Sequence, residues 1–110
     1  MERPFTTHAD IYVDINGCSL KGYLKDIRYD QLVATFGEPH NPEGYKTDYE
    51  WDILFPCGTV ATIYNWKNGP NYCGDEGLAA HEIRNWNVGG HKVEAHDLVK
   101  AALGMDGGAA

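Results

Sequence analysis

The sequence predicts an α+β fold: an antiparallel sheet of about five strands in the order ββαβββα, with two helices packed on one face. The 110 residues suffice for one domain with a single modest core. Two turn sequences, an Asn-Gly pair and a Pro-Cys-Gly triplet, each lie between stretches of alternating apolar and polar residues, the pattern of β-hairpins. Two other stretches change to helical spacing. We expect a single domain over residues 1–104 and a flexible tail over 105–110.

A first hairpin is expected over residues 10–26, "DIYVDINGCSLKGYLKD". Asn16 and Gly17 fit the two positive-φ positions of a type I′ turn, whose twist matches the flanking strands. The register that this turn sets makes one face of the hairpin apolar. That face would pair Ile15 with Cys18, Val13 with Leu20, and Ile11 with Gly22.

A short amphipathic helix is expected next, because the hydrophobic period changes from two to that of a helix. Asp26 can cap its start, Gly37 can take the left-handed conformation at its end, and Pro39 prevents its continuation. The residues that recur at helical spacing are Tyr29, Leu32, Val33 and Phe36.

A second hairpin is expected over residues 49–66, "YEWDILFPCGTVATIYNW". Pro56 presets φ for the first turn position and Gly58 suits a left-handed bulge, which together indicate a three-residue connection. A slip of one residue would exchange the two faces of this hairpin. The core face is expected to carry Trp51, Ile53, Phe55, Ala61 and Ile63. The opposite face is expected to carry Glu50, Asp52, Leu54, Val60, Thr62, Tyr64 and Trp66.

The remaining chain predicts a long loop, a fifth strand and a terminal helix. Residues 67–80 contain three glycines and one proline with little periodicity, which is typical of a functional loop. The strand is expected within 81–90 and ends in a Gly-Gly bend, and the helix is expected over 91–104. Its sheet-facing residues would be Val93, Leu98, Val99 and Ala102, with Gly104 as its stop.

The charge balance limits the kinds of partner. Asp and Glu number 16 against 9 Lys and Arg, so the formal net charge is -7. An acidic chain gains little from phosphate backbones, so direct nucleic-acid binding is not expected. The same charge suits attraction to a basic partner, and it also serves solubility alone.

Cysteine usage and hydropathy predict the cytoplasm. The three cysteines are odd in number and form no C-x-x-C pair, which indicates free thiols in a reducing compartment. No apolar signal segment follows Met1, and no apolar run reaches membrane-spanning length, so no membrane association is expected.

Three segments carry a resemblance to known proteins: "FGEP", "WDILFPCGTVATIYNWKNG" and "IRNWNVGG". Together they resemble a recurrent core of small accessory proteins encoded by tailed phages, including those that infect actinobacteria. Members with known roles often modify host processes or block antiviral defence. The resemblance implies a phage setting and a host protein as partner, and it brings no functional residues with it. In shape, the helix followed by a Trp-containing strand is similar to half of a β-lactamase-inhibitor-like domain, which binds other proteins with an aromatic-bearing sheet.

The candidate binding surface lies at the open end of the second hairpin, where two loops meet. Tyr and Trp give large contact areas at low entropic cost and concentrate at binding sites. Acidic residues of the 67–80 loop can meet basic groups of a partner and speed the encounter. The chain is also expected to form a homodimer or small homo-oligomer, because an antiparallel sheet with an apolar second face commonly dimerises. The alternatives for the aromatic residues are that they pack under the loop or form this self-interface. The predicted partner-binding residues are Tyr45, Tyr64, Trp66, Lys67, Tyr72, Asp75 and Glu76.

No enzyme and no cofactor are predicted, because nucleophile, base and orienting group do not fall into a recognised spacing. Cys57 lies at a hairpin tip far from other reactive groups, and the acidic neighbours of Cys73 would raise the pKa of its thiol. A zinc site is a weak alternative whose ligands would be His81, His91, Cys73 and Asp75. A further alternative is an oligomer that sequesters a nucleotide-like ligand, with stacking on Trp66 or Tyr72 and phosphate contacts from Lys46, Lys67 and Arg84.

Overall fold

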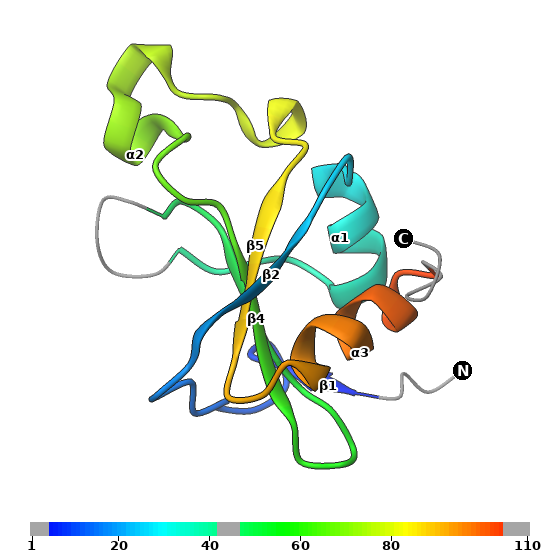
Figure 1. The fold of residues 1–110 in the computed structure, drawn as a ribbon. Coiled ribbons are helices and arrows are strands. Elements are labelled where there is room, and N and C mark those ends of the chain that lie inside the picture. Colours follow the sequence, from blue (N-terminus) through cyan, green and yellow to red (C-terminus); the bar gives the residue numbers. More distant parts are fainter. Residues whose placement is uncertain (1–4, 42–46, 105–110) are drawn as a thin grey trace.

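A five-stranded antiparallel sheet forms the centre of the molecule in the computed structural model (Figure 1). The structure describes residues 5–41 and 47–104. The strands are β1 (Thr6–Thr7), β2 (Ser19–Leu24), β3 (Glu50–Leu54), β4 (Val60–Tyr64) and β5 (Trp86–Gly90). The helices are α1 (Tyr29–Phe36), the single turn α2 (Pro70–Cys73) and α3 (Glu94–Ala102), joined by the 3-10 turns η1 (Gly74–Glu76) and η2 (Ala80–Glu82).

The strands follow the order β1-β3-β4-β5-β2, and α1 and α3 cover one face of the sheet (Figure 1). Trp51 and Trp86 lie fully buried under these helices, with ring centroids 5.4 Å apart in an edge-to-face arrangement. Their indole N–H groups donate to the carbonyl oxygens of Gly37 (2.7 Å) and Ile27 (2.9 Å), so burial leaves neither donor unpaired. Burying a large apolar side chain contributes about 1.5–3 kcal/mol, which makes this layer the main source of stability. The predicted α+β fold class is confirmed.

The second hairpin has the predicted register. Trp51 lies opposite Ile63, Asp52 opposite Thr62 and Ile53 opposite Ala61. The connection closes through the Phe55 N–H, which donates to the Thr59 carbonyl at 2.9 Å. Gly58, at φ +90°, takes the left-handed position. The core face of the hairpin is the predicted one, and Glu50, Asp52, Thr62 and Tyr64 lie on the face away from the helices.

The predicted first hairpin is wrong. A turn does form, because the Cys18 N–H donates to the Ile15 carbonyl at 3.1 Å, but it is not the predicted type I′ turn: Gly17 has φ +82°, whereas Asn16 does not take the positive φ that this type requires. The segment before the turn is not a strand, and β2 pairs with β5 instead, at the far edge of the sheet from β1. Pairing with β5 brings the buried Leu24 opposite the buried Trp86, whereas Ile11 stays exposed. Apolar burial therefore decides the pairing of β2 over the local turn preference.

Two details of the helices also differ from expectation. Asp26 does not cap α1: it has φ +59°, and the side-chain oxygen of Gln31 accepts the Arg28 N–H at 2.8 Å instead. The predicted core positions of α1 are confirmed, with Leu32 and Phe36 fully buried. In α3 the prediction for Val93 is wrong, since it precedes the helix and is exposed. The buried residues of α3 are Ala95 and Val99, which pack against the sheet.

The Gly-Gly pair lies inside β5 and does not form the expected bend. Gly89 pairs with Thr62 on one side and Leu20 on the other, and Gly90 pairs with Ala61 and Ser19. A Cβ atom on Gly90 would lie 2.6 Å from the Ala95 Cβ, so glycine lets α3 approach the sheet. The bend follows at His91 and Lys92. The expected tail over 105–110 lies outside the described residues.

Candidate functional site

The face of the sheet opposite the helices is polar and hollowed. Glu50 of β3 lies directly opposite Tyr64 of β4, and Asp52 lies opposite Thr62. A pocket of about 220 Å³ opens here. Its walls include Glu50, Thr62, Tyr64 and Trp66 from the hairpin and Cys18 from the turn before β2. The pocket thus joins the aromatic open end of the hairpin to the carboxylate of Glu50.

Four of the predicted site residues come together at this open end. The rings of Tyr64 and Trp66 meet edge to face with centroids 6.2 Å apart. The ammonium of Lys67 lies 5.9 Å from the Trp66 ring centroid and 5.6 Å from that of Tyr72, within the range of cation–π attraction. Trp66 is 47% exposed and Tyr72 is 43% exposed, so both rings present area to solvent. We call Tyr64, Trp66, Lys67 and Tyr72 the aromatic cluster.

The other predicted residues have different positions. Asp75 and Glu76 form the exposed turn η1 directly after α2, which carries Tyr72, so acidic groups follow the aromatic cluster along the chain. Tyr45 and Lys46 lie outside the described residues. Arg84 lies elsewhere, because its guanidinium contacts Asp26 at 3.4 Å in the connection between β2 and α1.

A buried amide holds the loop that carries Tyr72. Asn65, fully buried after β4, accepts the backbone N–H groups of Asp48 (2.8 Å) and Tyr49 (2.9 Å) with its side-chain oxygen. Its amide nitrogen donates to Asp48 Oδ1 at 3.1 Å and to Asn68 Oδ1 at 2.9 Å. The other oxygen of Asp48 accepts the Asn71 N–H at 3.0 Å, at the start of α2. Sequence reasoning missed Asn65. The available signal is an Asn between a strand and a Gly-rich loop, because Asn side chains there often hydrogen-bond to backbone groups.

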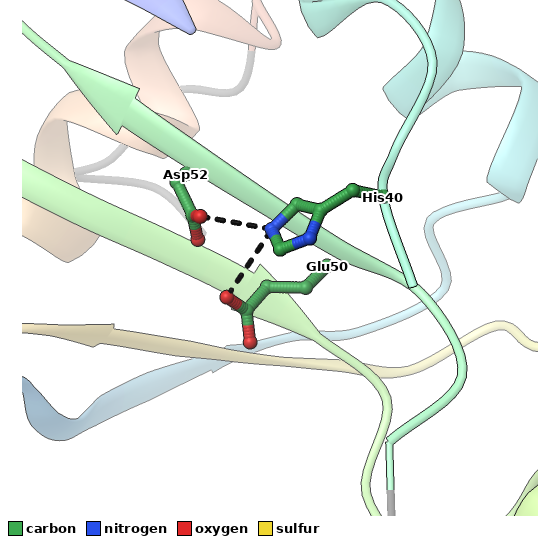
Figure 2. A group of neighbouring side chains, drawn as sticks. All are labelled: His40, Glu50 and Asp52. Atoms are coloured by element: carbon green, nitrogen blue, oxygen red, sulfur yellow. Dashed lines mark hydrogen bonds and ion pairs between the residues drawn. The ribbon is translucent and has the colours of Figure 1, made fainter. Parts of the chain in front are cut away.

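A second group of side chains, missed by sequence reasoning, occupies the same face (Figure 2). His40 Nε2 lies 2.8 Å from Asp52 Oδ2 and 3.5 Å from Glu50 Oε2, and Figure 2 shows both carboxylates turned toward the ring. Within the described ranges, these three residues are the group of His, Cys, Asp or Glu side chains whose ligand atoms converge, all within 4.8 Å of one another. We call them the carboxylate–histidine cluster.

Burial controls the electrostatics of this cluster. The side chains of Glu50 and Asp52 are only 13% and 9% exposed. Burial raises the pKa of Glu50 to about 8, and the neighbouring carboxylate of Asp52 adds to the rise. Oδ1 of Asp52 is buried without a hydrogen-bond partner. Two carboxyl groups in so little water favour neutralisation by a proton or a cation.

No family model, curated protein or solved structure matches this chain. In the part of the chain that the structure describes, no helix has the length and apolar character needed to cross a bilayer.

The weak zinc alternative from the sequence is not supported by the geometry. His91 Nε2 contacts the Asn16 carbonyl oxygen at 2.7 Å, and the thiol of Cys73 donates to the Lys67 carbonyl at 3.3 Å. His81 and Asp75 lie on two separate 3-10 turns. Among the described residues, these four do not form a converging ligand group.

Proposed function

We propose that this chain is a non-enzymatic binding protein that engages a second protein through its aromatic cluster. The observation that carries this proposal is that the Lys67 ammonium lies within cation–π distance of two half-exposed rings, Trp66 and Tyr72. The loop that carries them is held by the buried amide of Asn65. Rings that are already positioned lose little freedom on binding, so their contact area contributes efficiently to affinity. Binding would act by occlusion, with aromatic side chains filling pockets of the partner.

The proposed partner is basic. The formal net charge of -7 and the exposed pair Asp75 and Glu76 beside the aromatic cluster favour a surface rich in Lys and Arg. The resemblance to phage accessory proteins makes a cytoplasmic host protein the proposed partner, with host takeover or anti-defence as the biological role. The proposed surface also includes Tyr45, which lies outside the described residues.

The nucleotide-binding alternative has less support. Of the three cations expected to meet phosphates, Lys67 lies at the aromatic cluster, Arg84 pairs with Asp26, and Lys46 lies outside the described residues. Lys67 alone, close in sequence to the acidic turn η1, is a poor phosphate site, because the carboxylates of Asp75 and Glu76 repel a phosphate group.

Affinity capture from the lysate of a susceptible host tests the proposal. Wild type and Trp66→Ala are compared with Tyr12→Ala, a matched control that removes an aromatic ring 84% exposed on a different segment. Because interface aromatics are frequent hot spots, we expect Trp66→Ala to weaken binding to the captured protein by at least about 30-fold. Tyr12→Ala should bind as wild type does.

Two results would contradict the proposal. One is capture of the same protein with equal affinity by wild type and Trp66→Ala. The other is a concentration-dependent wild-type oligomer, measured by light scattering, that Trp66→Ala converts to monomer, since the aromatic cluster would then be a self-interface.

A further inference from the structure

The backbone fixes the carboxylate–histidine cluster before any ligand arrives. His40 and Glu50 form an antiparallel bridge, in which each backbone N–H donates to the other residue's carbonyl at 2.9 Å. Asp52 follows two positions later on β3, so its side chain leaves the same face as that of Glu50. The three side chains therefore converge from two adjacent extended segments, which are more rigid supports than free loops.

His8 supports Asp52 from the other side. Its backbone N–H donates to the Asp52 carbonyl at 2.9 Å, and its ring Nδ1 accepts the Asp52 N–H at 3.3 Å. With Nδ1 accepting, Nε2 carries the proton and donates to the Glu38 carbonyl at 3.0 Å. The rings of His8 and His40 lie with centroids 4.7 Å apart. These contacts hold the position of Asp52 and restrict the His40 ring.

The spacing of the ligand atoms suits a small divalent ion. Bonds of about 2.0–2.2 Å at a tetrahedral angle place neighbouring ligand atoms about 3.3 Å apart. The His40 Nε2 atom lies 2.8 Å and 3.5 Å from the two carboxylate oxygens, one on each side of that value. One neutral imidazole with two carboxylates also balances the charge of a divalent ion, which favours binding at a site with little water.

Asp52 provides an independent indication of a ligand. Its side chain is more than nine-tenths buried, yet Oδ1 has no hydrogen-bond partner. A buried acceptor without a partner costs about 1–3 kcal/mol, and more for a charged group. A cation bound by both oxygens of this carboxylate would supply the contact that Oδ1 lacks, because the His40 ring meets only Oδ2.

We propose that His40, Glu50 and Asp52 bind one Zn²⁺ ion through one imidazole nitrogen and two carboxylate oxygens. Imidazole favours Zn²⁺ over Mg²⁺ and Ca²⁺, which prefer all-oxygen sites. Three protein ligands would leave a fourth position on a tetrahedral ion. Two of the ligands, His40 and Asp52, also line a pocket of about 290 Å³ whose walls include His8 and Tyr12. The ion site is distinct from the aromatic cluster and does not depend on the proposed function.

Ion binding is measured directly on the full chain. The protein is dialysed against a chelator and then titrated with ZnCl₂ or MgCl₂ in a calorimeter, without any protein partner. We expect one Zn²⁺ per chain, no comparable binding of Mg²⁺, and a higher melting temperature with Zn²⁺. Co²⁺ serves as a spectroscopic probe, and its bound spectrum should lack a sulfur charge-transfer band, because none of the three ligands is a thiol.

Near-isosteric variants test each ligand. Glu50→Gln, Asp52→Asn and His40→Gln should each weaken Zn²⁺ binding by at least about tenfold while the circular dichroism spectrum stays native. His81→Gln and Asp75→Asn are the matched controls, since they remove an exposed imidazole and an exposed carboxylate on other turns and should bind Zn²⁺ as wild type does.

Three results would overturn this proposal. The first is the absence of saturable Zn²⁺ binding by wild type, which needs no variant to fold. The second is unchanged affinity in all three ligand variants. The third is a sulfur band with Co²⁺, which would assign the ion to the thiols. Loss of protein capture by Trp66→Ala with intact Zn²⁺ binding would leave both proposals standing, so their failures are distinguishable.

Discussion

At the scale of single residues, the buried side-chain amide of Asn65 holds together the segments of the chain before β3 and after β4. Its four hydrogen bonds join the end of β4 to Asp48 before β3 and to Asn68 in the following loop. Through Asp48, the same network reaches the backbone of α2. The loop that carries Tyr72 therefore depends on a side chain that is itself fully buried.

Replacing Asn65 by Ala should destabilise the protein by about 2–4 kcal/mol, because two backbone N–H groups near Asp48 lose their acceptor in a buried setting. Asn68→Ala is the control, since it removes only one acceptor from a half-buried position and should cost less than about 1 kcal/mol. Urea denaturation followed by circular dichroism gives both values. Equal stability of the two variants would show that the hydrogen bonds of Asn65 to the Asp48 and Tyr49 backbone contribute little to stability.

The cysteines provide a prediction on pH. A hydrogen bond with the Thr59 side chain lowers the pKa of Cys57 below its ordinary value of 9.0, whereas burial, reinforced by the charge of Asp52, raises the pKa of Cys18. The thiolate is the reactive form, so Cys57 should alkylate with a midpoint below pH 9 and Cys18 with a midpoint above it. Mass spectrometry of iodoacetamide-treated protein from pH 7 to 10 measures both rates.

A variant at Thr59 tests whether the Thr59 hydroxyl lowers the pKa of Cys57. Thr59→Val should move the Cys57 midpoint upward and leave the Cys18 midpoint unchanged. Identical profiles for Cys57 in wild type and Thr59→Val would mean that the hydroxyl has no influence on the thiolate.

Sequence reasoning at this scale succeeded where neighbours in sequence are also neighbours in space. Tyr64, Trp66, Lys67 and Tyr72 lie within nine positions of one another, and the structure brings them together. Sequence reasoning did not find the role of His40. Its meeting with Glu50 and Asp52 depends on an isolated bridge, which periodicity and turn chemistry do not reveal.

At the scale of elements, β5 is the strand on which the sheet depends, because it joins β4 to β2. Its two terminal glycines allow close approach on opposite faces. A Cβ on Gly90 would meet the Ala95 methyl at 2.6 Å and the Val60 carbonyl oxygen at 3.0 Å. A Cβ on Gly89 would meet the Thr62 hydroxyl at 2.6 Å, an atom that can rotate away.

Gly90→Ala should therefore destabilise the protein by about 1–3 kcal/mol, since α3 must move outward to admit the methyl group. Gly89→Ala should be the milder of the two substitutions. Chemical denaturation of both variants checks the order. A Gly89→Ala protein less stable than Gly90→Ala would contradict the close packing of α3 on β5.

The two hairpins explain what the sequence could and could not predict about elements. In the second hairpin, turn residues, alternation and core burial favour one register, and the structure has that register. In the first, the turn and the alternation agree locally, but β2 gains more by placing Leu24 against Trp86, more than 60 positions away in the chain. Single-sequence patterns carry no signal for a pairing at that distance.

At the scale of the whole molecule, the sheet separates the apolar core from the two candidate sites. One face is closed by α1 and α3 over the tryptophan pair and provides the stability. Among the described residues, no helix covers the other face (Figure 1). That face carries both the aromatic cluster and the carboxylate–histidine cluster, and Glu50 and Tyr64 lie opposite one another between them. If the proposed binding sites are correct, substitutions of their exposed side chains should change binding with little effect on the core.

The pairing of β2 with β5 also has a consequence for biosynthesis. The chain finishes β2 at Leu24, but its partner strand begins at Trp86, 62 positions later (86 − 24). At a translation rate of about 5–20 residues per second, the ribosome needs roughly 3–12 s to supply that partner. During this interval β2 has no ladder to join, and its apolar residues are available to chaperones. Completion of the sheet therefore waits until β5 has been synthesised.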